Sequence, residues 1–128
     1  MQDIALILAG AIGAIVAVIH GVLVRRKMAA PLAAVLSDEN QYPASIARLT
    51  PVLLDFSGYN WLLGGLALIA APYILGPEGI VVVAVLVGSS YLFASIGNFW
   101  GTRGRHPGWA LYAIATALVI YGAWRPLG

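Results

Sequence analysis

Four long apolar runs constrain what this chain can fold into more than any other feature of its sequence. They cover about residues 4–24, 51–71, 79–99 and 107–124. Each is close to the ~20 residues that an α-helix needs to cross the roughly 30 Å hydrocarbon core of a bilayer. Only 9% of the residues are charged, against about 25% in soluble chains. The sequence therefore predicts an all-α integral membrane protein, a four-helix bundle forming a single transmembrane domain over residues 1–128.

Helix-breaking residues separate these runs. Gly76, Pro77 and Gly79 lie between the second and third runs, and residues 101–108 between the third and fourth. Thr50 can cap free backbone N–H groups and Pro51 suits a first helical position, so the second helix is expected to begin there. Pro126 is expected to end the last helix.

Lysine and arginine predict the orientation. The first and third connecting segments hold six basic residues, whereas the opposite side has only Arg125. Because positive residues favour cytoplasmic segments, both termini are expected outside. The six basic residues are Arg25, Arg26, Lys27, Arg48, Arg103 and Arg105.

The same distribution argues against nucleic acid as a partner. The pI is near 9.2, but the positive charge lies between apolar runs, as membrane topology requires. No positive charge precedes the first run, so that run is expected to stay as a helix rather than be removed as a signal peptide. The chain has no cysteine, which excludes disulfides and thiolate metal sites.

The first connecting segment, residues 25–49, is the longest. Residues 31–36 and 44–49 are apolar stretches on either side of a polar turn at 37–40. They predict two short helices at the cytoplasmic membrane interface. An irregular loop is the alternative.

Small residues predict where helices approach closely. Ala9, Gly13, Ala17 and Gly21 recur every four residues in the first run, and Gly64 and Gly65 lie in the second. Helices in lipid associate through such small residues because apolar burial gives no driving force there. Packing within the bundle is favoured, with self-association as the alternative.

Polar residues gather at one depth near the cytoplasmic side. At 1.5 Å per residue, Asp55 and His20 lie roughly 6–7 Å inside their helices, and Asn98 closes the third helix. We expect a cytoplasm-facing pocket in which Asp55 pairs with His20 or a loop arginine. Residues expected to contribute or to contact a ligand are Tyr59, Tyr91, Trp100, Arg103, Arg105 and His106.

The alternative is that Asp55 forms only a structural pair at the interface, where charge is cheaper than at the midplane. Asn60 lies deeper, and an amide there more often joins helices than lines a transport path.

No catalytic motif is present, so an enzyme is not favoured. Two histidines permit haem ligation, although no further signature supports it. Quinone is a second candidate cofactor, and a lipid phosphate near Arg103 and Arg105 is a third ligand.

These features predict a non-enzymatic subunit or accessory protein of a membrane complex in the bacterial inner membrane. Its expected partners are the lipid bilayer and other membrane chains. Two alternatives remain open: a small oligomeric transporter or channel with a polar path near Asp55 and Asn60, and a binder of haem, quinone or lipid at the cytoplasmic pocket.

Overall fold

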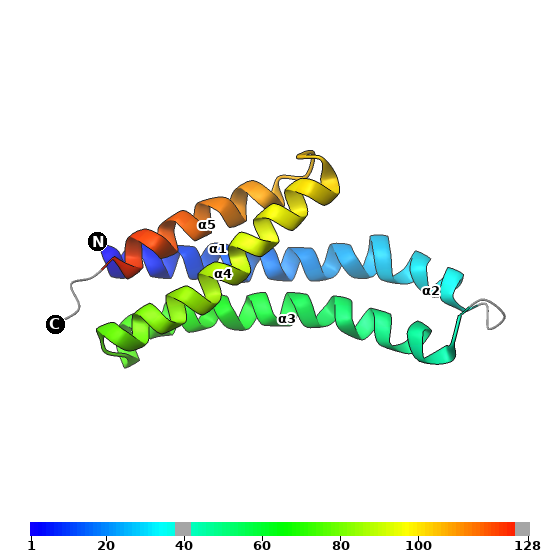
Figure 1. Ribbon diagram of the computed structural model, residues 1–128, viewed down its shortest axis with the longest axis horizontal. Coiled ribbons are helices and arrows are strands. Elements are labelled where there is room, and N and C mark those ends of the chain that lie inside the picture. Colours follow the sequence, from blue (N-terminus) through cyan, green and yellow to red (C-terminus); the bar gives the residue numbers. More distant parts are fainter. Residues whose placement is uncertain (38–41, 125–128) are drawn as a thin grey trace.

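The computed structural model describes residues 1–37 and 42–124, which are helical with no strand among them (Figure 1). Three continuous helices, Gln2–Leu36, Ala44–Ile74 and Pro77–Thr102, are long and apolar enough to cross a membrane. The apolar helix Gly108–Ala123 is shorter, at 16 residues. The all-α prediction is confirmed for this part of the chain.

In order, the elements are α1 (Gln2–Val24), the π-helical turn η1 (Arg25–Ala29), α2 (Ala30–Leu36), α3 (Ala44–Ile74), α4 (Pro77–Thr102) and α5 (Gly108–Ala123).

Helix α1 occupies the middle of the arrangement. It packs against α3 on one side and α5 on the other, while α4 packs against α5 and, less extensively, α3 (Figure 1). The amide of Gln2 donates to the carbonyl of Trp124, which holds the start of α1 beside the end of α5. The α3–α4 turn lies at this same end, whereas α2 and the α4–α5 turn lie at the other.

One large side chain from each of α1, α3, α4 and α5 is fully buried at the centre. These are Leu6, Leu68, Tyr91 and Tyr112, all below 2% exposure. Around them lie mainly alanine and valine, which let the helices approach while the two tyrosines fill the volume. Large apolar residues on the outside of every long helix are exposed, as expected for surfaces that face lipid or other membrane chains.

Helices α1 and α3 approach each other closely at two glycines. A Cβ added to Gly65 would lie 2.6 Å from the Gly10 carbonyl oxygen and 2.9 Å from the Ala14 nitrogen. One added to Gly10 would overlap the Gly65 carbonyl oxygen. Both obstacles are backbone atoms, which cannot rotate away, so only glycine permits this crossing.

The small residues of the predicted stripe have different surroundings. Ala9 and Ala17 are buried, and a Cβ on Gly13 would overlap the Tyr91 hydroxyl. Gly64 lies beside Val87, whereas Gly21 has open space where a side chain would be. The N-terminal part of the stripe, from Ala9 to Ala17, therefore packs against other helices of the fold.

The predicted start of the second long helix at Pro51 is wrong. Helix α3 begins at Ala44, after Pro43, and Pro51 lies inside it. A helical proline leaves one carbonyl without its N–H donor, a loss that neighbouring side chains can offset in membrane helices. Thr50, expected to cap the start of this helix, lies inside it as well. Its hydroxyl donates to the Ile46 carbonyl at 2.8 Å.

The stretches expected as separate interfacial helices extend the long helices instead. Residues 31–36 belong to α2, which continues α1 through η1, and residues 44–49 form the first turns of α3. The irregular-loop alternative is therefore wrong for both stretches. Of the predicted polar turn, residues 38–40 lie outside the described residues, as do Arg125 and Pro126.

Helix α4 ends at Thr102, within the glycine-containing segment 101–108 that the sequence predicts as a helix breaker. Arg103 and Gly104 both adopt positive φ, 52° and 73°, and the Gly104 N–H donates to the Phe99 carbonyl at 2.8 Å. This is the usual left-handed end of a helix. The indole N–H of Trp109 donates to the Gly104 carbonyl at 3.1 Å, which ties the turn to α5.

The α1–α3 crossing gives a direct test. We expect Gly10→Ala to lower the free energy of unfolding by about 1–3 kcal/mol, because the added methyl meets backbone. Gly21→Ala, on the same helix but facing open space, should change it little or raise it by up to about 1 kcal/mol. Reversible unfolding in mixed detergent micelles measures both variants, and equal effects would contradict the crossing.

Candidate functional site

The polar residues predicted to share one pocket lie on two sides of α1. Asp55 faces α1 from α3 and pairs with Arg25. His20, Asn98 and His106 line a separate cleft between α1 and the α4–α5 turn. The residues thus share a level along the helices without forming one site.

Arg25 and Asp55 form a two-pronged ion pair. Arg25 Nε and Nη2 donate to Asp55 Oδ1 and Oδ2 at 3.1 and 2.9 Å. The side chains are 72% and 42% exposed, so the pair is open to its surroundings. Arg25 is the first residue after α1, and the pair therefore joins the end of that helix to α3. Of the partners expected for Asp55, the structure pairs it with an arginine and not with His20.

The second site consists of two adjoining cavities of about 200 and 270 Å³. We call them together the histidine cleft. Both cavities are lined by His20, Leu23, Asn98 and His106. Other lining residues are Val16, Ile19, Val24, Lys27, Met28, Thr102, Pro107, Gly108, Leu111 and Tyr112.

The α4–α5 turn fixes His106. The Gly108 N–H donates to His106 Nδ1 at 3.0 Å, and the His106 N–H donates to the Thr102 hydroxyl at 3.4 Å. A neutral imidazole whose Nδ1 accepts a hydrogen bond carries its proton on Nε2. His106 therefore has an Nε2–H group to donate.

Asn98 and His20 are held by local contacts. The Asn98 amide donates to the Ala94 carbonyl at 2.8 Å, and the Thr102 hydroxyl donates to the Asn98 backbone carbonyl at 2.6 Å. The His20 ring meets Trp61 edge-on, with centroids 4.8 Å apart. These contacts leave the cleft with several fixed polar groups and otherwise apolar walls.

Behind the cleft, aromatic rings continue into the core. Trp61 contacts Tyr112 and Tyr112 contacts Tyr91, with centroids 5.1 and 5.2 Å apart. The Tyr91 hydroxyl donates a long hydrogen bond, 3.5 Å, to the Trp61 carbonyl. The Tyr112 hydroxyl is buried and has no partner within residues 1–37 and 42–124. Such an unpaired group is costly, and Tyr112 also lines the cleft.

The aromatic residues expected to contact a ligand are not brought together. Tyr91 is buried in the core, whereas Tyr59 and Trp100 are 57% and 83% exposed. Arg103 and Arg105 are exposed on the α4–α5 turn.

Asn60 is exposed on α3. It lines a groove of about 300 Å³ between α3 and α4, together with Gly64, Ser90 and Tyr91.

Four residues of the two sites are not assigned from the sequence. Lys27 is used there only for the orientation, and Arg25 is included among the loop arginines, one of which is expected to pair with Asp55. Neither Trp61 nor Tyr112 is singled out, although Tyr112 lies several residues inside its apolar run, which is a signal for core packing. Thr102 had no sequence signal of its own.

The donor set does not favour a metal or haem. Among the described residues, no group of three or more His, Asp or Glu side chains could hold a metal ion. His106 Nδ1 is already an acceptor, so axial ligation through Nε2 would require loss of its proton. A neutral imidazole cannot both accept at one nitrogen and bind metal at the other.

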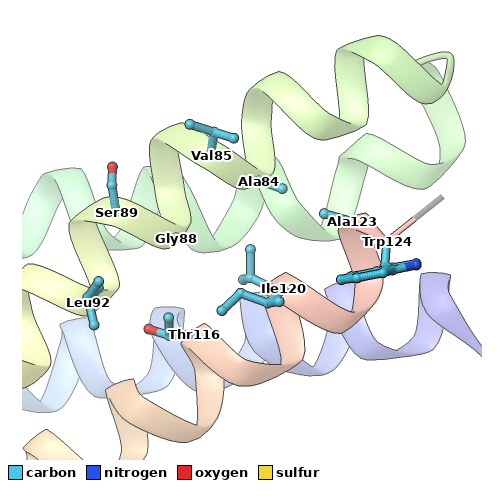
Figure 2. A pocket seen from close by; sticks show the side chains of 10 residues that line it. Ala84, Val85, Gly88, Ser89, Leu92, Thr116, Ile120, Ala123 and Trp124 are labelled. Carbon is cyan, nitrogen blue, oxygen red and sulfur yellow. The ribbon is translucent and has the colours of Figure 1, made fainter. Parts of the chain in front are cut away.

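An apolar groove of about 360 Å³ runs between α4 and α5 (Figure 2). Its two hydroxyls are satisfied by their own helices, since Ser89 donates to the Leu86 carbonyl and Thr116 to the Tyr112 carbonyl. The groove is therefore lined by apolar side chains and the Trp124 indole, and both of its hydroxyls already donate to backbone.

No protein-family model matches the chain, and comparisons with curated proteins and with solved structures give no match.

The unpaired Tyr112 hydroxyl predicts an unusual response to mutation. In protein freed of lipid, we expect Tyr112→Phe to leave the unfolding midpoint unchanged or raise it, because the ring packing stays and an unpaired polar atom is removed. Tyr91→Phe, which loses the bond to the Trp61 carbonyl, should lower it slightly. A larger loss for Tyr112→Phe than for Tyr91→Phe in thermal unfolding would contradict this interpretation.

Proposed function

We propose that the chain is an integral protein of a bacterial cytoplasmic membrane, a bundle in which α1, α3, α4 and α5 all span and both termini lie outside. The distribution of charge supports this. The basic residues of η1, the start of α3 and the α4–α5 turn belong to the end of the molecule opposite the N-terminus (Figure 1), and such clusters favour the cytoplasm.

Helix α5 is short for a span but suitably anchored. Its 16 residues extend about 24 Å at 1.5 Å per residue, less than the roughly 30 Å of hydrocarbon. Trp109 is its second residue and Trp124 follows its last residue. Interfacial tryptophans and a locally thinner bilayer accommodate a mismatch of this size.

Because the chain has no native cysteine, single cysteines test the orientation. A membrane-impermeant maleimide should label Gly76→Cys, in the α3–α4 turn, in intact cells. It should label Ser45→Cys, at the start of α3, only after permeabilisation. The reverse pattern would contradict the orientation, and labelling of both in intact cells would contradict four spans.

We propose that this protein is a non-enzymatic subunit that packs against a partner membrane chain. The observation that carries this is the exposed groove between α3 and α4. Within the described part of the chain, neither the Asn60 amide nor the Ser90 hydroxyl has a hydrogen-bond partner. Asn60 lies five residues beyond Asp55, about 7.5 Å deeper along the helix.

An amide facing hydrocarbon without a partner is costly. Asparagine side chains in such positions hydrogen-bond across helices, and small residues allow the approach. Gly64 lies one turn from Asn60 in the same groove. A partner helix seated there would satisfy the amide, which supports assembly.

A transport path receives less support. Asp55 is engaged by Arg25 on an exposed surface, and Tyr91, Tyr112, Leu6 and Leu68 fill the centre of the molecule.

Native mass spectrometry of the protein extracted in mild detergent tests the subunit role. We expect a stoichiometric complex whose partner is lost in Asn60→Leu, because leucine keeps the size but not the hydrogen bonds. The control is Leu63→Asn, which keeps Asn60 and adds an amide at another exposed position on α3, and it should leave the complex intact. A partner of different mass supports an accessory subunit, a second copy assigns the groove to self-association, and a monomer throughout contradicts the proposal.

A further inference from the structure

The histidine cleft lies at the level of the membrane surface. Lys27 follows α1 by three residues, and Asn98 and Thr102 occupy the last turns of α4. In the proposed orientation this is where α1 and α4 leave the hydrocarbon on the cytoplasmic side. Phospholipid headgroups occupy the same depth, whereas acyl chains lie deeper.

Apart from Tyr112, the ionisable residues that line the cleft are basic. Among the described residues, its lining includes Lys27 and two histidines but no aspartate or glutamate. Asp55 is on the other side of α1 and is engaged by Arg25. Hydrogen bonds from cationic or N–H donors to phosphate oxygens are among the stronger ones in proteins, so the lining complements an anion.

The donors are held in place before any ligand arrives. The Gly108 N–H bond fixes the His106 ring and leaves Nε2–H to donate, and the edge contact with Trp61 orients His20. Tyr112 also lines the inner cavity, and its hydroxyl is fully buried. The cleft thus presents His106 and His20 in fixed positions beside Lys27.

The remaining walls are apolar. Leu23 belongs to both cavities, Met28 lines the outer one and Leu111 the inner one. A cleft with polar groups at the membrane surface and aliphatic walls beside them matches an amphiphile with an anionic head and a hydrocarbon tail better than it matches a soluble anion.

We propose that the histidine cleft binds the headgroup phosphate of an anionic phospholipid, with Lys27, His20 and His106 as donors and an acyl chain along the apolar wall. This site is separate from the α3–α4 groove, so it does not depend on the subunit role. It gives the protein a preference for one lipid class at its cytoplasmic end.

Lipid retention in native mass spectrometry tests the site. Delipidated protein is mixed with dioleoylphosphatidylglycerol or, separately, with dioleoylphosphatidylcholine. We expect one retained phosphatidylglycerol, and retention about tenfold weaker in Lys27→Gln, the loss expected for one charge-assisted hydrogen bond. The matched control is Arg26→Gln, which removes an equal charge from the same turn but does not line the cleft, and it should change retention less than twofold.

A second variant separates binding from folding. His20→Phe keeps an aromatic ring against Trp61 but removes both ring nitrogens, so it should weaken retention while leaving the unfolding midpoint near that of the wild type. A variant that retains phosphatidylglycerol as tightly as the wild type would overturn the role of His20.

Other outcomes overturn the proposal. Equal losses in Lys27→Gln and Arg26→Gln would indicate general charge attraction. Equal retention of phosphatidylcholine would show that the anionic head is not recognised. Displacement of the lipid by millimolar inorganic phosphate would assign the cleft to a soluble anion, and a quinone instead of phospholipid in protein extracted from native membranes would assign it to that cofactor.

Discussion

The contact between the backbones of α1 and α3 at Gly10 and Gly65 is the constraint on which the rest of this structure depends. In lipid, apolar side chains gain nothing by leaving their surroundings, so helices must associate through close van der Waals contact and hydrogen bonds. Two facing glycines provide that contact because each presents only backbone to the other. With α1 held against α3, its remaining faces are available to α5 and to the tyrosines of the core.

The buried tyrosines follow from this arrangement. Gly13 lies three residues after Gly10 and makes room for the Tyr91 hydroxyl, and Tyr91 packs on Tyr112 and through it on Trp61. These large rings fill the space that small residues leave between the helices. The ion pair and the histidines lie away from this core, at the Arg25–Asp55 contact and in the histidine cleft.

The two proposed binding sites lie on different surfaces of the protein. The α3–α4 groove holds an amide and a hydroxyl that a partner helix would use, and the histidine cleft holds fixed donors that a lipid headgroup would use. A subunit that holds a partner on one side and an anionic lipid on another needs no catalytic group. A small chain can serve both proposed binding roles, because the groups involved lie on outer faces and at helix ends rather than in an enclosed volume.

The sequence by itself determined the helical class and the positions of the apolar helices, because every backbone polar group inside a bilayer must be satisfied within its own helix. It misplaced the start of α3 at Pro51, since a proline can either begin a helix or be tolerated inside one, and only the surrounding chain decides between them. It also predicted Asp55, His20 and Asn98 at one depth, from the helical rise alone. Only the tertiary structure decided that α1 separates Asp55 from the histidines, because the direction in which each helix turns its side chains depends on how the helices pack around one another.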